Sequence, residues 1–356
     1  MKLLNPGPVT LTKGVRQALL GDDLCHREPE FAELSQRIIS GLANVYEDAN
    51  AQYVPVLLTS SGTGAVEAMF SLVPGAGSNT LVAANGVYGD RAAAMLTAQG
   101  KRHHVVSSPW TSPIDFAAIE TALQAGNFDH VFAVHHETTT GRLNDIDKLG
   151  ALCTRYKVPL LLDAVSSFAG ERIQFAEWNL LACAATANKC LHGVPGIAMV
   201  LVHKPAFTDR KSGATSVYLD LFRYRKEQTN GFSPFTQSVQ VLYALDRALI
   251  ELSAQGGWRA RHQRYSTLTN RVRSALAEMG IRAFLDDEAS YGVTLSSYRL
   301  PSGLAYERLH DELKREGFII YAGQGPFAGQ MFRVAVMGEL SDADIDQMLS
   351  IVRRLA

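Results

Sequence analysis

The sequence predicts an α/β protein with a large domain built on a mostly parallel sheet and a smaller C-terminal α+β domain. Between residues 54 and 202, apolar strand-like runs recur, and helical stretches separate the first five of them. These runs are apolar almost throughout, which is typical of strands in a parallel sheet that helices cover on both faces. Two long helical segments and then a set of shorter strands and helices follow, which indicates a second unit.

Composition limits the possible functions. The chain has 356 residues, 47% of them hydrophobic and 19% charged, which is enough for a buried core and favours two domains. A net charge of −1 argues against a surface for nucleic acid or an anionic membrane. Neither a membrane span nor a secretion signal is apparent. The four cysteines have no CxxC spacing, so we expect reduced thiols and a cytoplasmic location.

The elements of the large domain are expected in the following order. Helices at 12–20 and 29–46 come first, the second with apolar residues three and four apart from Phe31 to Val45. Seven strands follow, at 54–59, 80–84, 104–107, 131–134, 160–163, 180–185 and 197–202, with helices near 63–73, 88–99, 115–125 and 145–156.

The C-terminal part begins with long helices at 235–253 and 258–279, which Gly256 and Gly257 separate. Strands are expected near 281–285, 292–299, 318–321 and 331–336, and helices near 303–316 and 341–355. We therefore expect an N-terminal segment over 1–15, a large domain over 16–255 and a small domain over 256–356.

Lys189 is the residue around which the chain is organised. It lies in ATANKCLHGVPG, residues 185–196, between two apolar runs. A lysine is rarely buried without a partner, and loss of solvation lowers its pKa. The neutral amine can then form a Schiff base. The alternative is a lysine whose chain reaches out of a strand end to solvent.

Asp163 and the segment Ser61–Thr63 follow strand ends, where parallel sheets bind their ligands. Pyridoxal phosphate requires a lysine for its aldehyde, an acid for its pyridine nitrogen and a cradle for its phosphate. Asp163 is the candidate acid, and Ser61, Gly62 and Thr63 are the candidate cradle. Ordinary capping of backbone groups is the alternative for both segments.

Two further segments hold candidate pocket residues. Tyr88 follows the second strand and can stack on a planar ring, or it is an ordinary core tyrosine. In HHETTTG, residues 135–141, we expect Glu137, Thr138 and Thr139 to line the pocket. Adjacent histidines on a strand point to opposite faces, so neither 135–136 nor 103–104 is expected to bind a metal.

Arg333 lies between the apolar residues Phe332 and Val334 on an expected strand. An arginine in such surroundings needs an anionic partner, and its planar fork matches a carboxylate or a phosphonate. A structural ion pair is the alternative. For Arg27, helix capping or surface pairing is the preferred interpretation.

A family resemblance rests on nine segments that span nearly the whole chain. They are NPGPVT, SSGTGAVEA, NGVYGDR, HHETTTGRLNDI, LLLDAVSSFAG, ATANKCLHGVPG, RHQRY, FLDDE and FRVAVMGE. With them the chain resembles the class V aminotransferases, which are pyridoxal phosphate enzymes of fold type I. Within this group it is most similar to the branch that acts on 2-aminoethylphosphonate and pyruvate.

The resemblance implies roles for individual residues. Lys189 matches the lysine that carries the cofactor and shuttles the proton, Asp163 matches the partner of the pyridine nitrogen, and Tyr88 matches the stacking aromatic. The phosphate ligands and the remaining cofactor contacts match Ser61, Gly62, Thr63, Thr139, Val165 and Thr186. Arg333, with Gly7 and Pro8 of the N-terminal segment, matches the part of the active site that holds the acidic group of the substrate.

The resemblance also implies partners. Thr236 and Ser238 match a segment that reaches the cofactor phosphate of the neighbouring subunit, so a homodimer with shared active sites is expected. The substrates are a small-molecule amine and a keto acid, and no nucleic acid or membrane is expected.

The amino donor stays open, because CHREPEF at 25–31 is more similar to alanine–glyoxylate and serine–glyoxylate enzymes. A lyase acting on an aminophosphonate and a non-catalytic binding protein with this fold are further alternatives. Intact Lys189 and Asp163 argue against the last. A nucleotide-binding dehydrogenase is disfavoured because no GxGxxG follows the first strand.

Overall fold

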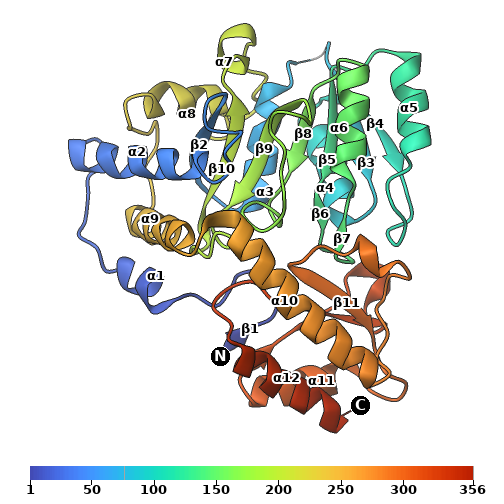
Figure 1. The fold of residues 1–356 in the computed structure, drawn as a ribbon. Helices are drawn as coiled ribbons and strands as arrows, with labels where there is room; N and C mark the ends of the chain where they lie inside the picture. The colour runs from blue at the N-terminus through green and yellow to red at the C-terminus, as the bar shows by residue number, and fades with distance from the viewer. Residues whose placement is uncertain (76, 356) are drawn as a thin grey trace.

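The computed structural model describes residues 1–75 and 77–355, and its larger unit is built on a seven-stranded sheet (Figure 1). The strand order is β2-β10-β9-β8-β5-β3-β4. The strands are β2 (Tyr53–Ser60), β3 (Asn79–Ala84), β4 (Arg102–Ser107), β5 (His130–Val134), β8 (Leu160–Asp163), β9 (Leu180–Thr186) and β10 (Gly196–His203). β10 is antiparallel to both neighbours, and the other pairings are parallel. The predicted α/β fold with a mostly parallel sheet is confirmed.

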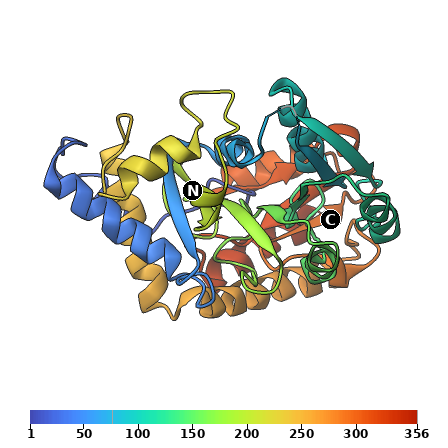
Figure 2. The same cartoon turned by 90° about the horizontal axis from the view of Figure 1, so that it is seen from above.

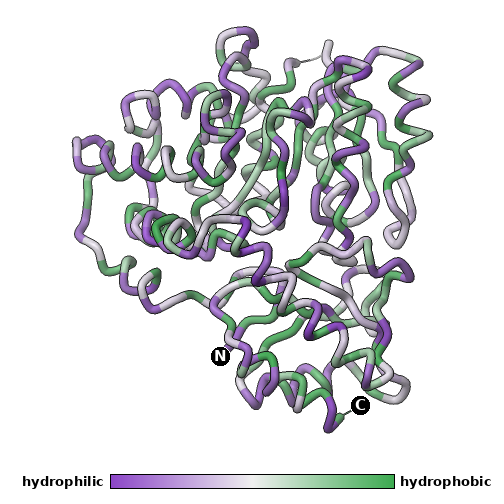
Figure 3. The backbone as a smooth tube through the Cα atoms, viewed as in Figure 1, coloured by the Kyte–Doolittle hydropathy of each residue, from purple (hydrophilic) through white to green (hydrophobic). Residues whose placement is uncertain are grey.

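Both faces of the sheet are covered, which explains why its strands are apolar without alternation. Leu160 and Leu162 of β8 belong to one hydrophobic core, and Leu161 between them belongs to another on the opposite face. In Figures 2 and 3 the hydrophobic strands lie between helices. The helices of this unit are α1 (Lys13–Ala18), α2 (Pro29–Ala43), α3 (Gly62–Met69), α4 (Val87–Ala98), α5 (Phe116–Ala125), α6 (Ile146–Arg155), α7 (Ala206–Asp209), α8 (Leu221–Gln228) and α9 (Val239–Ala254). α1 lies away from the sheet and packs on α9 (Figure 1).

The smaller unit begins along α10 (Gly257–Glu278), which runs from the large sheet down into it (Figure 1). Its sheet has the order β11-β14-β13, and α11 (Tyr306–Arg315) and α12 (Asp342–Leu355) complete it. The strands are β11 (Leu295–Arg299), β13 (Tyr321–Ala322) and β14 (Met331–Ala335). The domain limits at 15/16 and 255/256 stay a prediction.

The N-terminal segment joins this smaller unit. β1 (Lys2–Leu3) pairs in parallel with β12 (Phe318–Ile319), and the backbone amide of Ala335 donates to the carbonyl of Leu4. Residues 4–10 therefore run beside the end of β14 on their way to α1.

Several predicted elements differ in the structure. The predicted strand at 281–285 is wrong, because only an isolated bridge joins Ala283 to Tyr298. The apolar pattern there reflects burial of the side chains and not a strand ladder. The predicted strand at 318–321 is two short strands with different partners, β12 and β13. The predicted helix at 235–253 begins four residues later, at Val239.

Short elements were not predicted. They are β1, the hairpin of β6 (His136–Glu137) with β7 (Arg142–Leu143), and the helices α7 and α8. Two-residue strands and a four-residue helix are too short to show a period. Among the residues that the structure describes, no helix is long and apolar enough to span a bilayer.

We predict that the core of the large sheet is sensitive to loss of volume at Leu201, a fully buried residue of β10. Leu201→Ala should lower the free energy of unfolding by about 2–5 kcal/mol, because the cavity it leaves cannot fully collapse. Leu20→Ala is the control, since Leu20 is 85% exposed. Thermal and urea unfolding measure both variants, and equal midpoints would contradict the assigned packing of β10.

Candidate active site

A cavity of about 300 Å³ opens where the parallel strands end. It is lined by residues that follow β2, β3, β5, β8 and β9, and by the start of β10, which lies at the same edge because β10 runs in the opposite direction. The lining residues are Ser61, Gly62, Thr63, Tyr88, Arg91, Val134, His136, Asp163, Val165, Ser166, Thr186, Asn188, Lys189, Pro195 and Gly196. Eight of the predicted site residues are among them.

Lys189 follows β9 by three residues, and the N-terminal segment lies against it. Its Nζ donates to the carbonyl oxygen of Pro6. A Cβ atom on Gly7 would lie 2.7 Å from Cδ of Lys189, and the φ of Gly7 is +114°, so the position suits glycine alone. Burial lowers the pKa of Lys189 to about 8, and the charge of Arg333 adds to this lowering. The amine is therefore partly neutral near physiological pH.

Asp163 is the last residue of β8 and is 6% exposed. Its Oδ1 accepts a hydrogen bond of 2.9 Å from the backbone amide of Val165. No ion pair is found for this carboxylate within the described ranges. Burial raises the pKa of Asp163 to about 6, and the Val165 amide and the positive charge of Lys189 oppose that rise. A buried acid of this kind is a suitable acceptor for a protonated ring nitrogen.

The start of α3 forms a close-packed cradle at the same edge. Ser61 caps the helix, with its Oγ accepting from the amide of Gly64 at 3.4 Å. A Cβ atom on Gly62 would lie 2.6 Å from Val165 and 3.4 Å from Thr186. Only a glycine lets the helix start approach these two residues so closely. The free amides and the dipole of α3 favour an anion there, so capping and anion binding are compatible.

Tyr88 lies in the first turn of α4 and Arg91 lies one turn later on the same face. The guanidinium carbon of Arg91 is 4.8 Å from the centre of the Tyr88 ring, and Nη1 is 3.4 Å from Oγ1 of Thr63. Arg91 was missed, although its place in NGVYGDR three residues after Tyr88 was a signal.

His136 and Asn188 also line the cavity and were not among the predicted site residues. His136 had been considered only as a metal ligand. Its ring nitrogens contact Oγ1 of Thr294 at 2.9 Å and the carbonyl of Gly141 at 3.1 Å, so both serve structural bonds. Within residues 1–75 and 77–355 there is no cluster of three or more His, Cys, Asp or Glu side chains able to hold a metal ion.

Arg333 on β14 is 2% exposed and bonds only to neutral oxygens. Nε donates to the carbonyl of Ala322 at 3.0 Å, and Nη1 donates to the carbonyl of Thr138 at 2.8 Å and to Oε1 of Gln324 at 3.2 Å. No carboxylate pairs with it in the described part of the chain, so a structural ion pair is not its role. The buried hydroxyl of Thr138 likewise finds no hydrogen-bond partner there. Arg333 is thus a buried cation without a direct ion pair among the described residues. Burial lowers its pKa, and the charge of Glu137 is among the effects that oppose this lowering.

Other predicted site residues lie outside the lining of the cavity: Gly7, Pro8, Thr139, Thr236, Ser238 and Arg333 itself. Glu137 and Thr138, which were expected to line the pocket, are not in the lining either. Thr139 is fully buried and its hydroxyl donates to Oε1 of Glu137 at 2.6 Å. Thr236 is exposed, and the amide of Ser238 donates to Oγ1 of Thr59 at 3.1 Å before α9 begins. A single chain therefore does not bring Thr236 and Ser238 to its own cavity.

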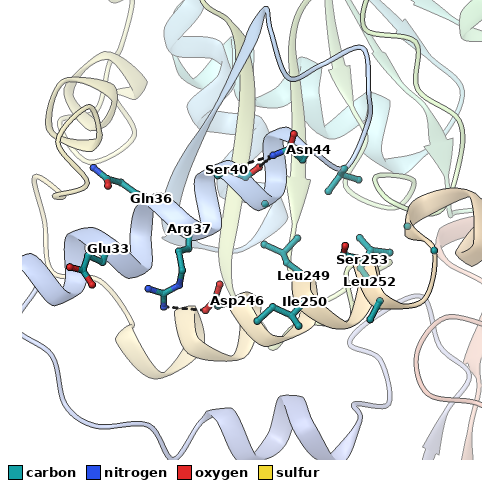
Figure 4. A pocket seen from close by; sticks show the side chains of 15 residues that line it. Glu33, Gln36, Arg37, Ser40, Asn44, Asp246, Leu249, Ile250, Leu252 and Ser253 are labelled. Carbon is teal, nitrogen blue, oxygen red and sulfur yellow. Dashed lines mark hydrogen bonds and ion pairs between the residues drawn. The ribbon is translucent and has the colours of Figure 1, made fainter.

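A larger hollow of about 1180 Å³ lies between α2 and α9 (Figure 4). Its walls include the ion pair of Arg37 with Asp246, at 3.3 Å, and Ile250, which is 53% exposed. It contains none of the predicted site residues and has no buried titratable group. The chemistry therefore belongs to the smaller cavity at the strand ends.

The residues of the smaller cavity fit pyridoxal phosphate on three independent observations. They include an amine whose pKa is lowered, a buried carboxylate without an ion-pair partner, and a helix start kept open by glycine. These are the groups that the aldehyde, the ring nitrogen and the phosphate of this cofactor require.

Comparison with known proteins identifies the family. The model of the family Aminotransferase class-V matches residues 25–341. The 2-aminoethylphosphonate–pyruvate transaminase of Klebsiella pneumoniae subsp. pneumoniae is 34% identical over 98% of this chain and 96% of that protein. The transaminase of the same name from Salmonella typhimurium is 33% identical, over 99% of this chain and 96% of that protein.

Solved structures confirm the predicted fold. The alanine–glyoxylate aminotransferase of Nostoc sp. superposes with a TM-score of 0.92 at 24% identity, over 99% of this chain and 94% of that one. The chain belongs to the class V aminotransferases of fold type I and is an aminotransferase that depends on pyridoxal 5′-phosphate.

Proposed function

We propose that this enzyme transfers the amino group of 2-aminoethylphosphonate to pyruvate, with phosphonoacetaldehyde and L-alanine as products. The names of the relatives at 33–34% identity support this substrate pair. The observation that carries it is Arg333, a buried guanidinium that bonds to three neutral oxygens and to no carboxylate of residues 1–75 and 77–355. Both substrates bear an acidic group, and one unpaired arginine can hold a phosphonate in one half-reaction and a carboxylate in the other.

The proposed chemistry depends on Lys189 and Asp163. When bound, pyridoxal phosphate supplies an aldehyde that accepts the amino group and a ring that withdraws electrons from the reacting carbon. Lys189 would carry the cofactor through its amine. Once released, the partly neutral amine would take a proton from the substrate carbon that bears the amino group and deliver it, in a 1,3-shift, to the former aldehyde carbon. The carboxylate of Asp163 holds the proton on the pyridine nitrogen.

The remaining roles follow the same proposal. The phosphate is held by Ser61, Gly62 and Thr63 at the start of α3, together with the hydroxyl of Thr186. Tyr88 would stack on the ring, and Thr139 and Val165 would be further cofactor contacts. Gly7 and Pro8 complete the acid-binding region with Arg333. The close approach of Gly7 to Lys189 supports the place of the N-terminal segment in this active site.

An amino acid–glyoxylate transaminase is the second candidate, because of the segment CHREPEF. This segment leads into α2, Arg27 is exposed, and no residue of 25–31 lines the cavity of this chain. A lyase that acts on an aminophosphonate is the third candidate. It would release product without a keto acid.

We propose that the enzyme is a cytoplasmic homodimer with shared active sites. Thr236 and Ser238 lie outside the cavity of their own chain and directly before α9, which forms one wall of the exposed groove with Ile250. A partner subunit that packs over this region would bury the apolar surface and bring the hydroxyls of Thr236 and Ser238 to its own cavity.

The substrate proposal predicts that Arg333→Lys loses most of its activity with 2-aminoethylphosphonate and pyruvate. Lysine lacks the planar fork, so kcat/KM should fall by roughly 100-fold, mainly through KM. Arg299→Lys is the matched control, because Arg299 lies on the neighbouring strand β11 and is exposed there. Alanine formation is followed with a coupled assay.

Wild-type enzyme without turnover of this pair, but with good activity on serine or alanine plus glyoxylate, would refute the substrate proposal. Product formed without any keto acid would favour the lyase.

The pKa of Lys189 predicts how fast the apoenzyme attaches its cofactor. Below the pKa, the fraction of Lys189 that is neutral rises about tenfold with each pH unit. The rate of covalent attachment should therefore rise with pH and level off above about 8. Absorbance measures attachment, and Nα-acetyl-lysine under the same conditions corrects for the ionisation of the cofactor. A rate that rises undiminished to about pH 10, as for an ordinary lysine, would contradict a lowered pKa.

Shared active sites predict that two inactive variants complement each other. The first variant, Lys189→Ala, lacks the residue that attaches the cofactor. The second carries both Thr236→Ala and Ser238→Ala, so it lacks the two hydroxyls proposed to act in the partner's site. A mixed dimer contains one intact site, so random mixing should restore about one quarter of the wild-type activity. Activity that stays at the sum of the two separate variants would show that the sites are not shared.

A further inference from the structure

Glu137 is a buried carboxylate that the proposed chemistry does not use. It is fully buried on the short strand β6. Oε2 accepts hydrogen bonds from the backbone amides of Tyr88 at 3.2 Å and Gly89 at 3.4 Å. Oε1 accepts from the amide of Thr139 at 3.2 Å and from its hydroxyl at 2.6 Å. One carboxylate thus joins the start of α4 to the segment after β6.

Gly86 shows how closely the chain is built around this carboxylate. A Cβ atom on Gly86 would lie 2.2 Å from Cδ of Glu137. The backbone of Gly86 is extended, with a φ of 175°, so any residue can adopt it. The obstacle to a side chain at position 86 is therefore the Glu137 carboxylate itself, and not backbone strain.

The segment that holds Glu137 also contacts Arg333. The carbonyl of Thr138, the next residue, accepts from Nη1 of Arg333 at 2.8 Å. Residues 137–139 therefore contact Tyr88 on the large-sheet side and Arg333 on the smaller unit.

We propose that Glu137 is a positioning residue that fixes the ring of Tyr88 and the guanidinium of Arg333 relative to each other. This inference rests on the proposed function of both residues. Glu137 acts through them and touches neither substrate nor cofactor. Three backbone amides and a hydroxyl satisfy both of its oxygens. Burial raises the pKa of Glu137 to about 7, while the hydrogen bonds from Thr139 and Gly89 favour the ionised form. When ionised, the carboxylate also interacts favourably with the dipole of α4.

The test compares Glu137→Gln with wild-type enzyme. Glutamine has the same shape, but its NH₂ group replaces one acceptor. Either the amides of α4 or the backbone amide of Thr139 therefore lose their acceptor, whereas the Thr139 hydroxyl can turn and accept instead. We expect cofactor affinity, from titration of the apoenzyme, to fall roughly tenfold, because hydrogen bonds to a charged group are lost. The circular dichroism band of the bound cofactor should change, because it reports the ring's orientation. The KM of the acid-bearing substrates should rise more than kcat falls.

Glu120→Gln is the matched control, since Glu120 forms a surface ion pair with Arg155 and should leave all three readouts unchanged. Gly86→Ala is a second, independent variant that displaces the carboxylate without removing it. It should reproduce the effects of Glu137→Gln, but add little in the background of Glu137→Ala, where the clash is absent.

The proposal is overturned if Glu137→Gln leaves the dichroism band unchanged and keeps the cofactor affinity and the KM values within about twofold of wild type. It is also overturned if Gly86→Ala has the same effect in the Glu137→Ala background as in wild-type enzyme. Cofactor titration and dichroism need no substrate. A failure of the substrate assignment would therefore appear in the wild-type assay and not in these measurements.

Discussion

Desolvation of the Lys189 amine is the constraint on which the rest of the site depends. Lys189 is partly buried in the cavity and forms no ion pair with any described residue. Burial makes its amine costly to charge and lowers its pKa to about 8, although the charge of Asp163 opposes this lowering. Nζ of Lys189 donates a hydrogen bond to the carbonyl of Pro6, and the absence of a side chain on Gly7 leaves room for the Lys189 side chain. The N-terminal segment is held in that place by β1 and by its bond to the end of β14. The N-terminal segment, the ends of the parallel strands and the smaller unit therefore all help to keep the Lys189 amine partly buried.

The fold creates this environment through its strand directions. Parallel strands end at one edge, so loops that are distant in sequence supply Ser61, Asp163 and Lys189 to a single cavity. Helices on both faces leave that edge as the place where polar groups can gather without disturbing the core. Arg333, the residue proposed to bind the acidic group of the substrate, lies on a different sheet, on β14, and donates a hydrogen bond to the carbonyl of Thr138. The packing of the smaller unit against the larger one therefore sets the distance between the Lys189 amine and the Arg333 guanidinium.

Sequence reasoning selected several residues that the structure places around one cavity. Lys189 and Asp163 interrupt or end apolar runs, and glycine beside serine marks the start of α3, so their patterns were visible without coordinates. Arg333 was visible because a cation stands between two apolar residues. Thr236 and Ser238 were selected by family resemblance alone, and the single chain leaves them outside the cavity.

What sequence reasoning missed depends on contacts between distant segments. Arg91 enters the cavity because α4 turns its face toward Thr63, and the role of Gly86 depends on a carboxylate fifty-one positions away. The predicted strand at 281–285 was wrong because burial and strand pairing produce the same apolar pattern. Short pairings such as β1 with β12 have no local signal at all, since two residues cannot show a period.

The central claim is that Lys189 is the single lysine that carries the cofactor. Borohydride reduction of the enzyme as isolated, followed by digestion and mass spectrometry, locates the attachment directly. The account predicts the added cofactor mass on the peptide that contains Lys189 and on no other lysine peptide. Attachment at a different lysine, or an enzyme that turns over its substrates without a trapped cofactor, would contradict it.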